Sequence, residues 1–146
     1  MDHIIISKMK DKKEIDFLQN KSSFNYTYDK ATIDSLKKHF ILEDSLYLIA
    51  KKGKEFVAFC SIDRDWWEEN FFFVREILVD IKFRKLGIGK EMMNRCIEHA
   101  RNKKATGVVT ETAFENSPMQ QLCEKIGFKK WDNPQWKEGI TYKLLF

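Results

Sequence analysis

Residues 71–103 constrain the fold most, because they join an apolar run, a short basic turn and an amphipathic segment. The run over residues 71–80 is mostly aromatic, β-branched or aliphatic, which predicts a strand covered on both faces. After the turn, apolar residues recur every four positions from Ile88 to Ala100, which predicts a helix with one face toward a core. A buried strand that leads through a tight turn into a helix indicates an α/β fold.

The turn itself, residues 84–90, reads Arg-Lys-Leu-Gly-Ile-Gly-Lys. Gly87 and Gly89 leave the backbone N–H groups of a helix N-terminus uncovered, and such a terminus attracts phosphate through its unpaired donors and its dipole. The basic side chains add positive charge. There is no third glycine and no Gly-Lys-Ser/Thr ending, so neither the dinucleotide fingerprint nor the P-loop is matched. We expect a phosphorylated ligand at this turn.

The remaining chain predicts further strands and helices around this unit. Strands are expected at residues 3–9, 46–51, 55–63, 106–112, 128–131 and 140–145, and helices after Asp11, at 32–39 and from Ser117 to Gly127. Residues 21–28 are expected to form a loop. Ser117 is the expected N-cap of the last helix, with Pro118 at its first position. The order βααβββαβαββ predicts an α/β fold with a mixed central β-sheet flanked by helices, in one domain over residues 1–146.

Composition excludes several functional classes. The chain has 146 residues, 43% of them hydrophobic, which suits one domain with a substantial core. A net charge of +4, from 26 basic and 22 acidic residues, is too balanced to indicate nucleic-acid binding. Three cysteines without paired spacing favour reduced thiols in a cytoplasmic protein, and scattered histidines favour no metal site. The apolar run at residues 4–6 is too short for a signal peptide or a membrane span.

Two motifs resemble those of the GNAT N-acetyltransferases. Residues 79–89, Val-Asp-Ile-Lys-Phe-Arg-Lys-Leu-Gly-Ile-Gly, are similar to the family's acetyl-CoA signature, Arg/Gln-x-x-Gly-x-Gly/Ala after a strand. Residues 116–128 begin with Asn and end Leu-Cys-Glu-Lys-Ile-Gly-Phe, which resembles the family's helix ending Leu-Tyr-x-Lys-x-Gly-Phe. The two motifs occur in the family's order and spacing, and with the preceding elements the resemblance covers nearly the whole chain.

The resemblance implies the GNAT fold and an acetyl-CoA-dependent N-acetyltransferase, which acts by direct attack on a primary amine of a small molecule or peptide. In the family, two central parallel strands part and admit the pantetheine arm of the cosubstrate. This implies main-chain contacts to the arm from Ile77, Leu78 and Val79, with the N–H of Leu78 at the thioester oxygen, and a side-chain contact from Asn116. The positions implied for the diphosphate are Arg84, Lys85, Leu86, Gly87, Ile88, Gly89 and Lys90.

Two carboxylates are candidates for the general base. Glu76 precedes the arm-binding residues on the strand face opposite Ile77, and Glu111 matches a glutamate that some amine-acetylating members carry near the end of the neighbouring strand. A carboxylate in an apolar wall has a raised pKa and can accept a proton. An ion pair, for instance with Arg75, is the competing interpretation. Of the two carboxylates, Glu76 is preferred.

Cys123 stands where the family usually has the tyrosine that is thought to protonate the leaving thiolate. A thiol can donate a proton in principle, but Cys123 can equally be a small apolar residue, with Tyr142, Tyr47 or water in its place. The missing tyrosine motivates a second hypothesis, a CoA-binding sensor or partner-binding module without catalysis.

The acceptor and the oligomeric state are left open by the sequence. Carboxylates between Asp63 and Glu69 hint at a cationic amine. The tryptophans at positions 66 and 67 are expected to cover the edge of the core, and a rim of the acceptor pocket is the alternative. A monomer and a homodimer are both compatible with the aromatic residues Trp131 and Trp136.

Overall fold

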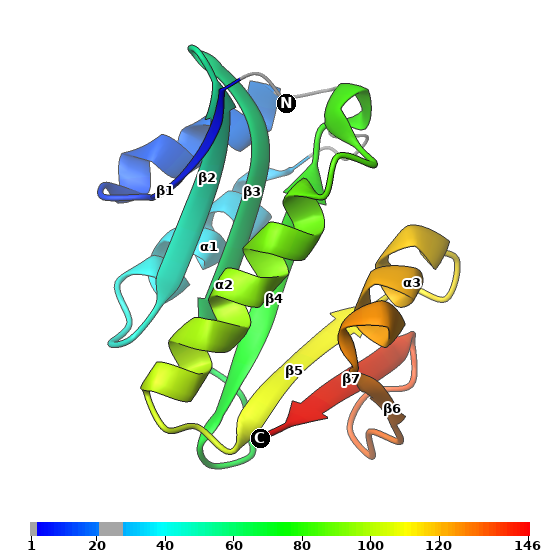
Figure 1. Cartoon of the computed structure of the whole chain (residues 1–146). Helices are drawn as coiled ribbons and strands as arrows, with labels where there is room; N and C mark the ends of the chain where they lie inside the picture. Colours follow the sequence, from blue (N-terminus) through cyan, green and yellow to red (C-terminus); the bar gives the residue numbers. More distant parts are fainter. Residues whose placement is uncertain (1–2, 21–27) are drawn as a thin grey trace.

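The computed structural model describes residues 3–20 and 28–146. Within these residues seven strands form one sheet in the order β1-β2-β3-β4-β5-β7-β6 (Figure 1). The strands are β1 (Ile4–Lys8), β2 (Leu46–Lys52), β3 (Glu55–Asp63), β4 (Phe71–Val79), β5 (Gly107–Thr112), β6 (Lys129–Trp131) and β7 (Ile140–Leu145). Strands β4 and β5 are parallel, and the other neighbours in the sheet are antiparallel. The predicted mixed sheet and element order are confirmed.

Helices cover both faces of this sheet (Figure 1). On one face lie η1 (Lys12–Asn20), a 3-10 helix, and α1 (Lys30–Phe40), whereas α2 (Ile88–Asn102) and α3 (Ser117–Ile126) lie on the other. A short 3-10 turn, η3 (Ile81–Phe83), leads from β4 toward α2. Except for Tyr28, the loop expected at residues 21–28 lies outside the described residues.

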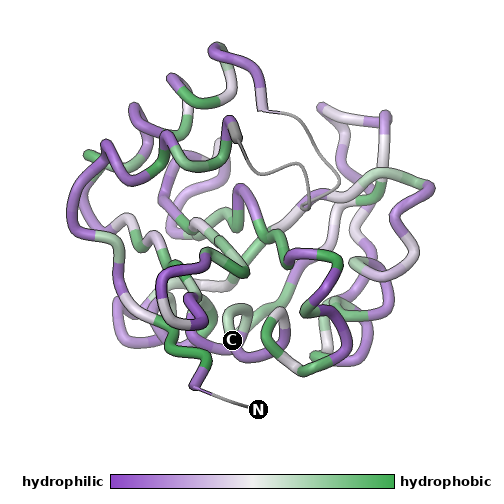
Figure 2. Tube along the Cα trace, turned by 90° about the horizontal axis from the view of Figure 1, so that it is seen from above, coloured by the Kyte–Doolittle hydropathy of each residue, from purple (hydrophilic) through white to green (hydrophobic). Residues whose placement is uncertain are grey.

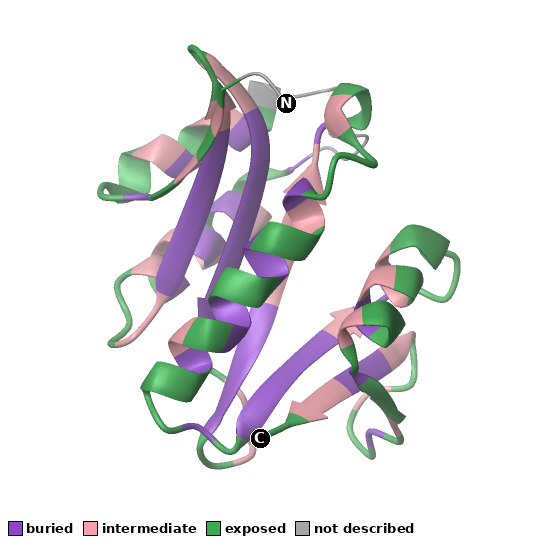
Figure 3. Ribbon diagram, in the orientation of Figure 1, coloured by how far each residue is buried: buried purple, intermediate pink, exposed green. Residues whose placement is uncertain are grey.

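Each layer of helices encloses its own core. Against α2 and α3 the sheet buries Phe72 and Val108 together with Met92 of the predicted apolar stripe. Against η1 and α1 it buries Phe59 with Leu36. Buried residues run along the central strands in Figure 3, and hydrophobic stretches run through the middle of the trace in Figure 2. The sheet is therefore covered on both faces at β2 and β3, and this layered core fixes the position of β4 beside them.

The predicted N-cap of α3 is wrong by one residue. The side chain of Asn116, not Ser117, accepts a hydrogen bond of 3.3 Å from the Met119 backbone N–H. Asparagine and serine cap helices about equally well, and a proline fits anywhere in the first turn because those N–H groups have no helical partner, so the sequence alone does not decide. Gly127 ends the helix in the left-handed conformation, as predicted, with φ 117°.

Two further properties concern the described residues as a whole. Among them, no helix combines the length and the apolar character needed to cross a membrane. Nor do three or more histidine, cysteine, aspartate or glutamate side chains within residues 3–20 and 28–146 gather into a group that could hold a metal ion.

Candidate active site

The parallel strands β4 and β5 part halfway along β4. Their pairing runs from Phe71 opposite Gly107 to Val74 opposite Thr110, after which β4 continues to Val79 beside β3 (Figure 1). The cause is a β-bulge: Ser61 on β3 pairs with Glu76 and Ile62 pairs with Val74, so Arg75 is an extra residue in β4. A bulge bends its strand and strengthens the local twist. The edge of β4 that faces β5 is therefore left open over Ile77, Leu78 and Val79.

The glycine turn lies directly beyond the open end of β4. Gly87 is the N-cap of α2 with φ 84° and has no side chain to cap the helix, and no cap hydrogen bond from a side chain is present within the described part of the chain. Lys85 is also left-handed, with φ 65°. The Arg84 Nε donates to the Val79 carbonyl over 3.1 Å, which ties the turn to the strand end. The turn thus presents backbone donors at a positive helix terminus among basic side chains.

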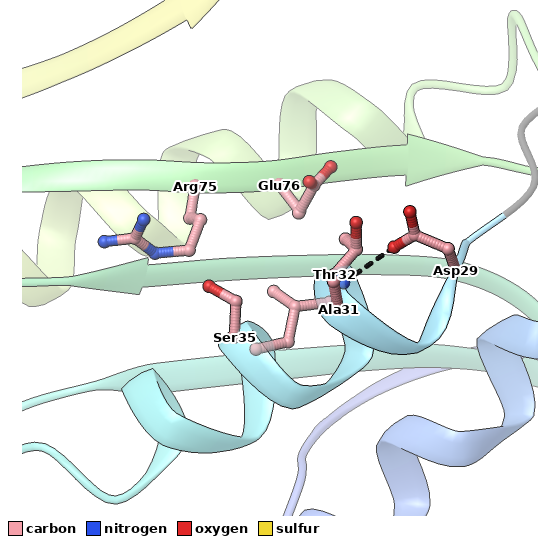
Figure 4. A pocket seen from close by; sticks show the side chains of 7 residues that line it. Asp29, Ala31, Thr32, Ser35, Arg75 and Glu76 are labelled. Atoms are coloured by element: carbon pink, nitrogen blue, oxygen red, sulfur yellow. Dashed lines mark hydrogen bonds between the residues drawn. The ribbon is translucent and has the colours of Figure 1, made fainter.

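Glu76 lies beside the gap, in a hollow of about 330 Å³ between β4 and α1 (Figure 4). The hollow is lined by Asp29, Ala31, Thr32, Ser35, Leu36, Arg75 and Glu76. The Tyr28 hydroxyl donates to the Glu76 carboxylate over 3.1 Å. Burial raises the pKa of Glu76 to about 7, although the Tyr28 bond and the charge of Arg75 lower it. A carboxyl with this pKa can take up a proton near neutral pH.

Arg75 does not pair with either candidate base through its hydrogen bonds. Its Nε and Nη2 donate to the two oxygens of the fully buried Asp63, each over 2.9 Å. The bulge turns Arg75 and Glu76 toward the same hollow, whereas neighbours in a regular strand face opposite sides. Glu111, on β5, has a pKa raised by burial and lowered by the charge of Arg75. The competing ion-pair interpretation therefore holds for Asp63 rather than for the two glutamates.

The Cys123 side chain is fully buried in the core between the sheet and α3. Burial raises the pKa of its thiol to about 12, with a further contribution from Glu124. The two tyrosines considered as alternatives are also buried and bonded: Tyr142 donates to Glu124 over 2.7 Å, and Tyr47 donates to the Leu36 carbonyl over 2.5 Å. The side chains of all three candidate proton donors are thus buried.

Thr112 and Tyr28 are site residues that the sequence interpretation missed. The Thr112 Oγ1 is buried and has no hydrogen-bond partner among the described residues, and it lies on β5 beyond the last pair with β4. Thr110 and Thr112 place two hydroxyls on one face of the predicted strand, and this pattern could have indicated Thr112 from the sequence. Tyr28 gave no such signal, because it meets Glu76 across 48 positions of sequence.

Trp66 agrees with the first of the two interpretations of the tryptophan segment, whereas Trp67 is 46% exposed. Trp66 stacks on Phe73 with ring centroids 5.3 Å apart and covers a small apolar cluster on the sheet. The neighbouring carboxylates are paired within the protein: Asp65 contacts His39 over 2.6 Å and Glu68 contacts Lys143 over 2.6 Å. Asp65 and Glu68 therefore already have partners within the protein.

Known proteins are similar to this chain in sequence or in fold. Over 92 residues the chain is 28% identical to an uncharacterized N-acetyltransferase of Methanocaldococcus jannaschii; the match covers 60% of this chain but only 40% of that protein. A GNAT-family acetyltransferase of Staphylococcus aureus Mu50 has the same fold at 18% identity and a TM-score of 0.78, covering 97% of this chain and 98% of its own. The PaiA N-acetyltransferase of Thermoplasma acidophilum, solved with coenzyme A, is 15% identical with a TM-score of 0.72 and covers 99% of both chains.

The family comparison extends from η1 to the end of α3. The model of the acetyltransferase (GNAT) family matches residues 13–128, which include the parted strands, the glycine turn and the helix that follows β5. The match thus spans most of the chain. Together with the fold, it shows that this chain belongs to the GNAT acetyltransferase family.

Proposed function

We propose that this chain transfers the acetyl group of acetyl-CoA to a primary amine of a small molecule or peptide. The observation that carries the proposal is the gap between β4 and β5, which ends at the uncapped N-terminus of α2 and has Glu76 at its side. A solved relative with the same fold holds coenzyme A, which supports the choice of donor. When bound, acetyl-CoA would supply an activated acyl group as a thioester.

The residues present fit such a ligand. The first-turn amides of α2, with Arg84, Lys85 and Lys90 near them, would hold the diphosphate. The open edge of β4 would pair with the amides of the pantetheine arm through Ile77 and Val79. The Asp80 N–H donates to the Val57 carbonyl on β3, and the alternation of an antiparallel pair then turns the Leu78 N–H toward Phe59 of β3, away from the gap and from the thioester oxygen expected for it. The buried Thr112 hydroxyl lacks a partner among the described residues and would gain one from the arm. Asn116 caps α3 through its side-chain oxygen, and its side chain would also contact the arm.

Glu76 is proposed as the general base, with Glu111 as the second candidate. A neutral amine attacks the acetyl carbon, the C–N bond forms, and the C–S bond breaks. The proton that the amine loses passes to Glu76, whose pKa of about 7 suits this transfer. The departing thiolate also needs a proton. Cys123 is the candidate at the family's tyrosine position, with Tyr142, Tyr47 and water as the alternatives. The Cys123 thiol is fully buried and has a pKa raised to about 12, so it gives up a proton less readily than a free thiol.

Calorimetry and a turnover assay test this function separately. Titration of the intact chain with acetyl-CoA should give binding at submillimolar concentration, and its absence would remove the proposal. Release of free thiol across a panel of primary amines then measures transfer. Glu76→Gln should keep acetyl-CoA affinity while kcat falls, and equal rates in both forms would exclude Glu76 as the base.

A CoA-binding module without turnover is the second candidate. The observation that favours it is Cys123, a buried thiol at the position of the family's usual proton donor. Tight binding of acetyl-CoA with no thiol release from any amine in the panel would support this module over the enzyme.

A further inference from the structure

A second and larger hollow lies at the other side of β5. Its volume is about 430 Å³, within the range of small-molecule sites. It is lined by Phe114, from the loop between β5 and α3, and by residues of β6, β7 and their connection: Lys130, Trp131, Asp132, Asn133, Trp136, Lys137, Gly139, Ile140 and Thr141. The proposed chemistry uses none of these side chains.

Sheet register connects this hollow to the candidate bases. Trp131 on β6 pairs with Thr141 on β7, and Thr141 pairs with Glu111 on β5. Paired residues of antiparallel strands point to the same face, with Cβ atoms about 5 Å apart. The three side chains therefore form one row across the sheet. This row places the hollow one strand away from the Glu111 carboxylate, on the face that Glu111 shares with Arg75 and the first hollow.

The aromatic walls of the hollow are held in place. A Cβ atom on Gly139 would collide with the Trp136 ring and the Thr112 carbonyl oxygen, so only a glycine at this position lets the indole pack so closely. The side chain of Gln120 donates to the carbonyls of Ala113 and Phe114 over 3.1 and 2.8 Å, which fixes the loop that carries Phe114. Phe114 is nevertheless 61% exposed. A large ring kept exposed on an ordered loop is suited to contact a ligand.

Charge in the hollow does not favour a polycation. Its acidic residue, Asp132, pairs with Lys137, and Lys130 is a further basic lining residue. A polyamine or aminoglycoside would bring several positive charges toward these lysines. A flat, uncharged group would instead stack between Phe114 and Trp136, while a single amino group reached the carboxylates one strand away.

On this basis, which rests on the proposed function, we propose that the hollow receives the ring of a short arylalkyl primary amine as acetyl acceptor. The spacing of about 5 Å between Glu111 and Thr141 matches a linker of two or three carbon atoms between ring and nitrogen. Phe114 and Trp136 are the specificity-determining residues of this subsite, because they form its walls without touching the reacting atoms.

The test compares 2-phenylethylamine with butylamine and spermidine as acceptors. For the intact chain we expect kcat/KM to favour 2-phenylethylamine by about tenfold or more over the other two. Phe114→Ala and Trp136→Ala should each remove most of this preference, because kcat/KM should fall far more for 2-phenylethylamine than for butylamine, with unchanged affinity for acetyl-CoA. Phe146→Ala is the matched control, because this exposed ring follows the opposite end of β7. Equal or better use of spermidine would overturn the proposal.

A second readout separates this inference from the proposed function. If acetyl-CoA fails to bind or no amine is acetylated, the enzyme proposal fails, but ring binding can still be measured by tryptophan fluorescence with 2-phenylethylamine alone. Saturable quenching that is lost in Trp136→Ala and retained in Phe146→Ala supports the subsite. The absence of a saturable change in tryptophan fluorescence in the intact chain would contradict the proposed subsite.

Discussion

The hydroxyl of Thr110 on β5 donates a hydrogen bond of 3.1 Å to the carbonyl of Val74 on β4, at the last register pair of the two strands. Thr112 follows on the same face of β5, beyond the bulge that bends β4 away, and its buried hydroxyl has no partner among the described residues. The two threonine hydroxyls therefore differ in their partners. That of Thr110 is bonded within the protein, and that of Thr112 lies beside the gap proposed for the pantetheine arm.

Valine at the two positions should therefore have opposite effects. Thr110→Val removes a hydrogen bond that the folded protein makes and should lower the free energy of unfolding by about 1 kcal/mol. Thr112→Val removes a buried hydroxyl that has no partner among the described residues, so stability should stay equal or rise, while the Kd for acetyl-CoA increases several-fold. Denaturant unfolding and calorimetry measure the two effects. A destabilised Thr112→Val variant with unchanged Kd would show that the hydroxyl has no part in binding.

The pH dependence of turnover should report Glu76. A base acts when deprotonated, so kcat should rise with pH through about 7 and then level. Glu76→Gln should lower kcat by about 10²- to 10⁴-fold and abolish this limb, whereas Glu111→Gln should preserve it. If only the Glu111 variant loses the limb, the base has been assigned to the wrong strand.

The same carboxyl gives an independent stability signature. Its pKa rises from 4.5 in the unfolded chain to about 7 in the folded protein, so the folded protein holds the extra proton between these values. Stability should fall as pH rises through this window, and Glu76→Gln should flatten the fall. The measurement is thermal unfolding from pH 4 to 8, which needs no substrate.

The sequence predicted most of the fold because its signals were local. Apolar residues at helical spacing from Ile88 to Ala100 are buried as expected, and the turn at residues 84–90 begins α2. The bulge at Arg75 was not predictable, since it arises from the pairing of β4 with β3 and not from any local preference. Likewise, the Tyr28 contact that tunes Glu76 depends on tertiary packing. The positions of the turn and the helix could thus be read from the chain, but the electrostatics of the proposed base could not.

Tyr28→Phe should shift the turnover profile rather than abolish it. The Tyr28 hydrogen bond lowers the pKa of Glu76, so its loss should raise this pKa above 7 and move the rising limb of kcat to higher pH. Maximal kcat at high pH should remain close to that of the intact chain. A lower kcat at every pH with an unmoved limb would mean that Tyr28 supports packing alone.

Cys123→Ala should change kcat by less than about threefold, because a thiol with a pKa of about 12 is a poor donor to a departing thiolate. The substitution leaves a small cavity and should cost about 1 kcal/mol of stability. Cys96→Ala, at another fully buried thiol of the same core, is the control. A loss of a hundredfold in kcat with intact acetyl-CoA affinity would instead assign the leaving-group proton to Cys123.

Gly89 allows a test of the diphosphate turn in which charge is separated from bulk. A Cβ atom here would lie 3.6 Å from Leu122 and 3.7 Å from Val79, which are ordinary contacts, so a side chain can leave the helix without strain. Gly89→Glu places a carboxylate at the N-terminus of α2, where it favours the helix but repels a diphosphate. We expect unchanged folding and a loss of about a hundredfold in affinity for acetyl-CoA, measured by calorimetry. Gly89→Gln, similar in size but uncharged, should lose far less, and equal losses in both variants would mean that bulk, not repulsion at this terminus, weakens binding.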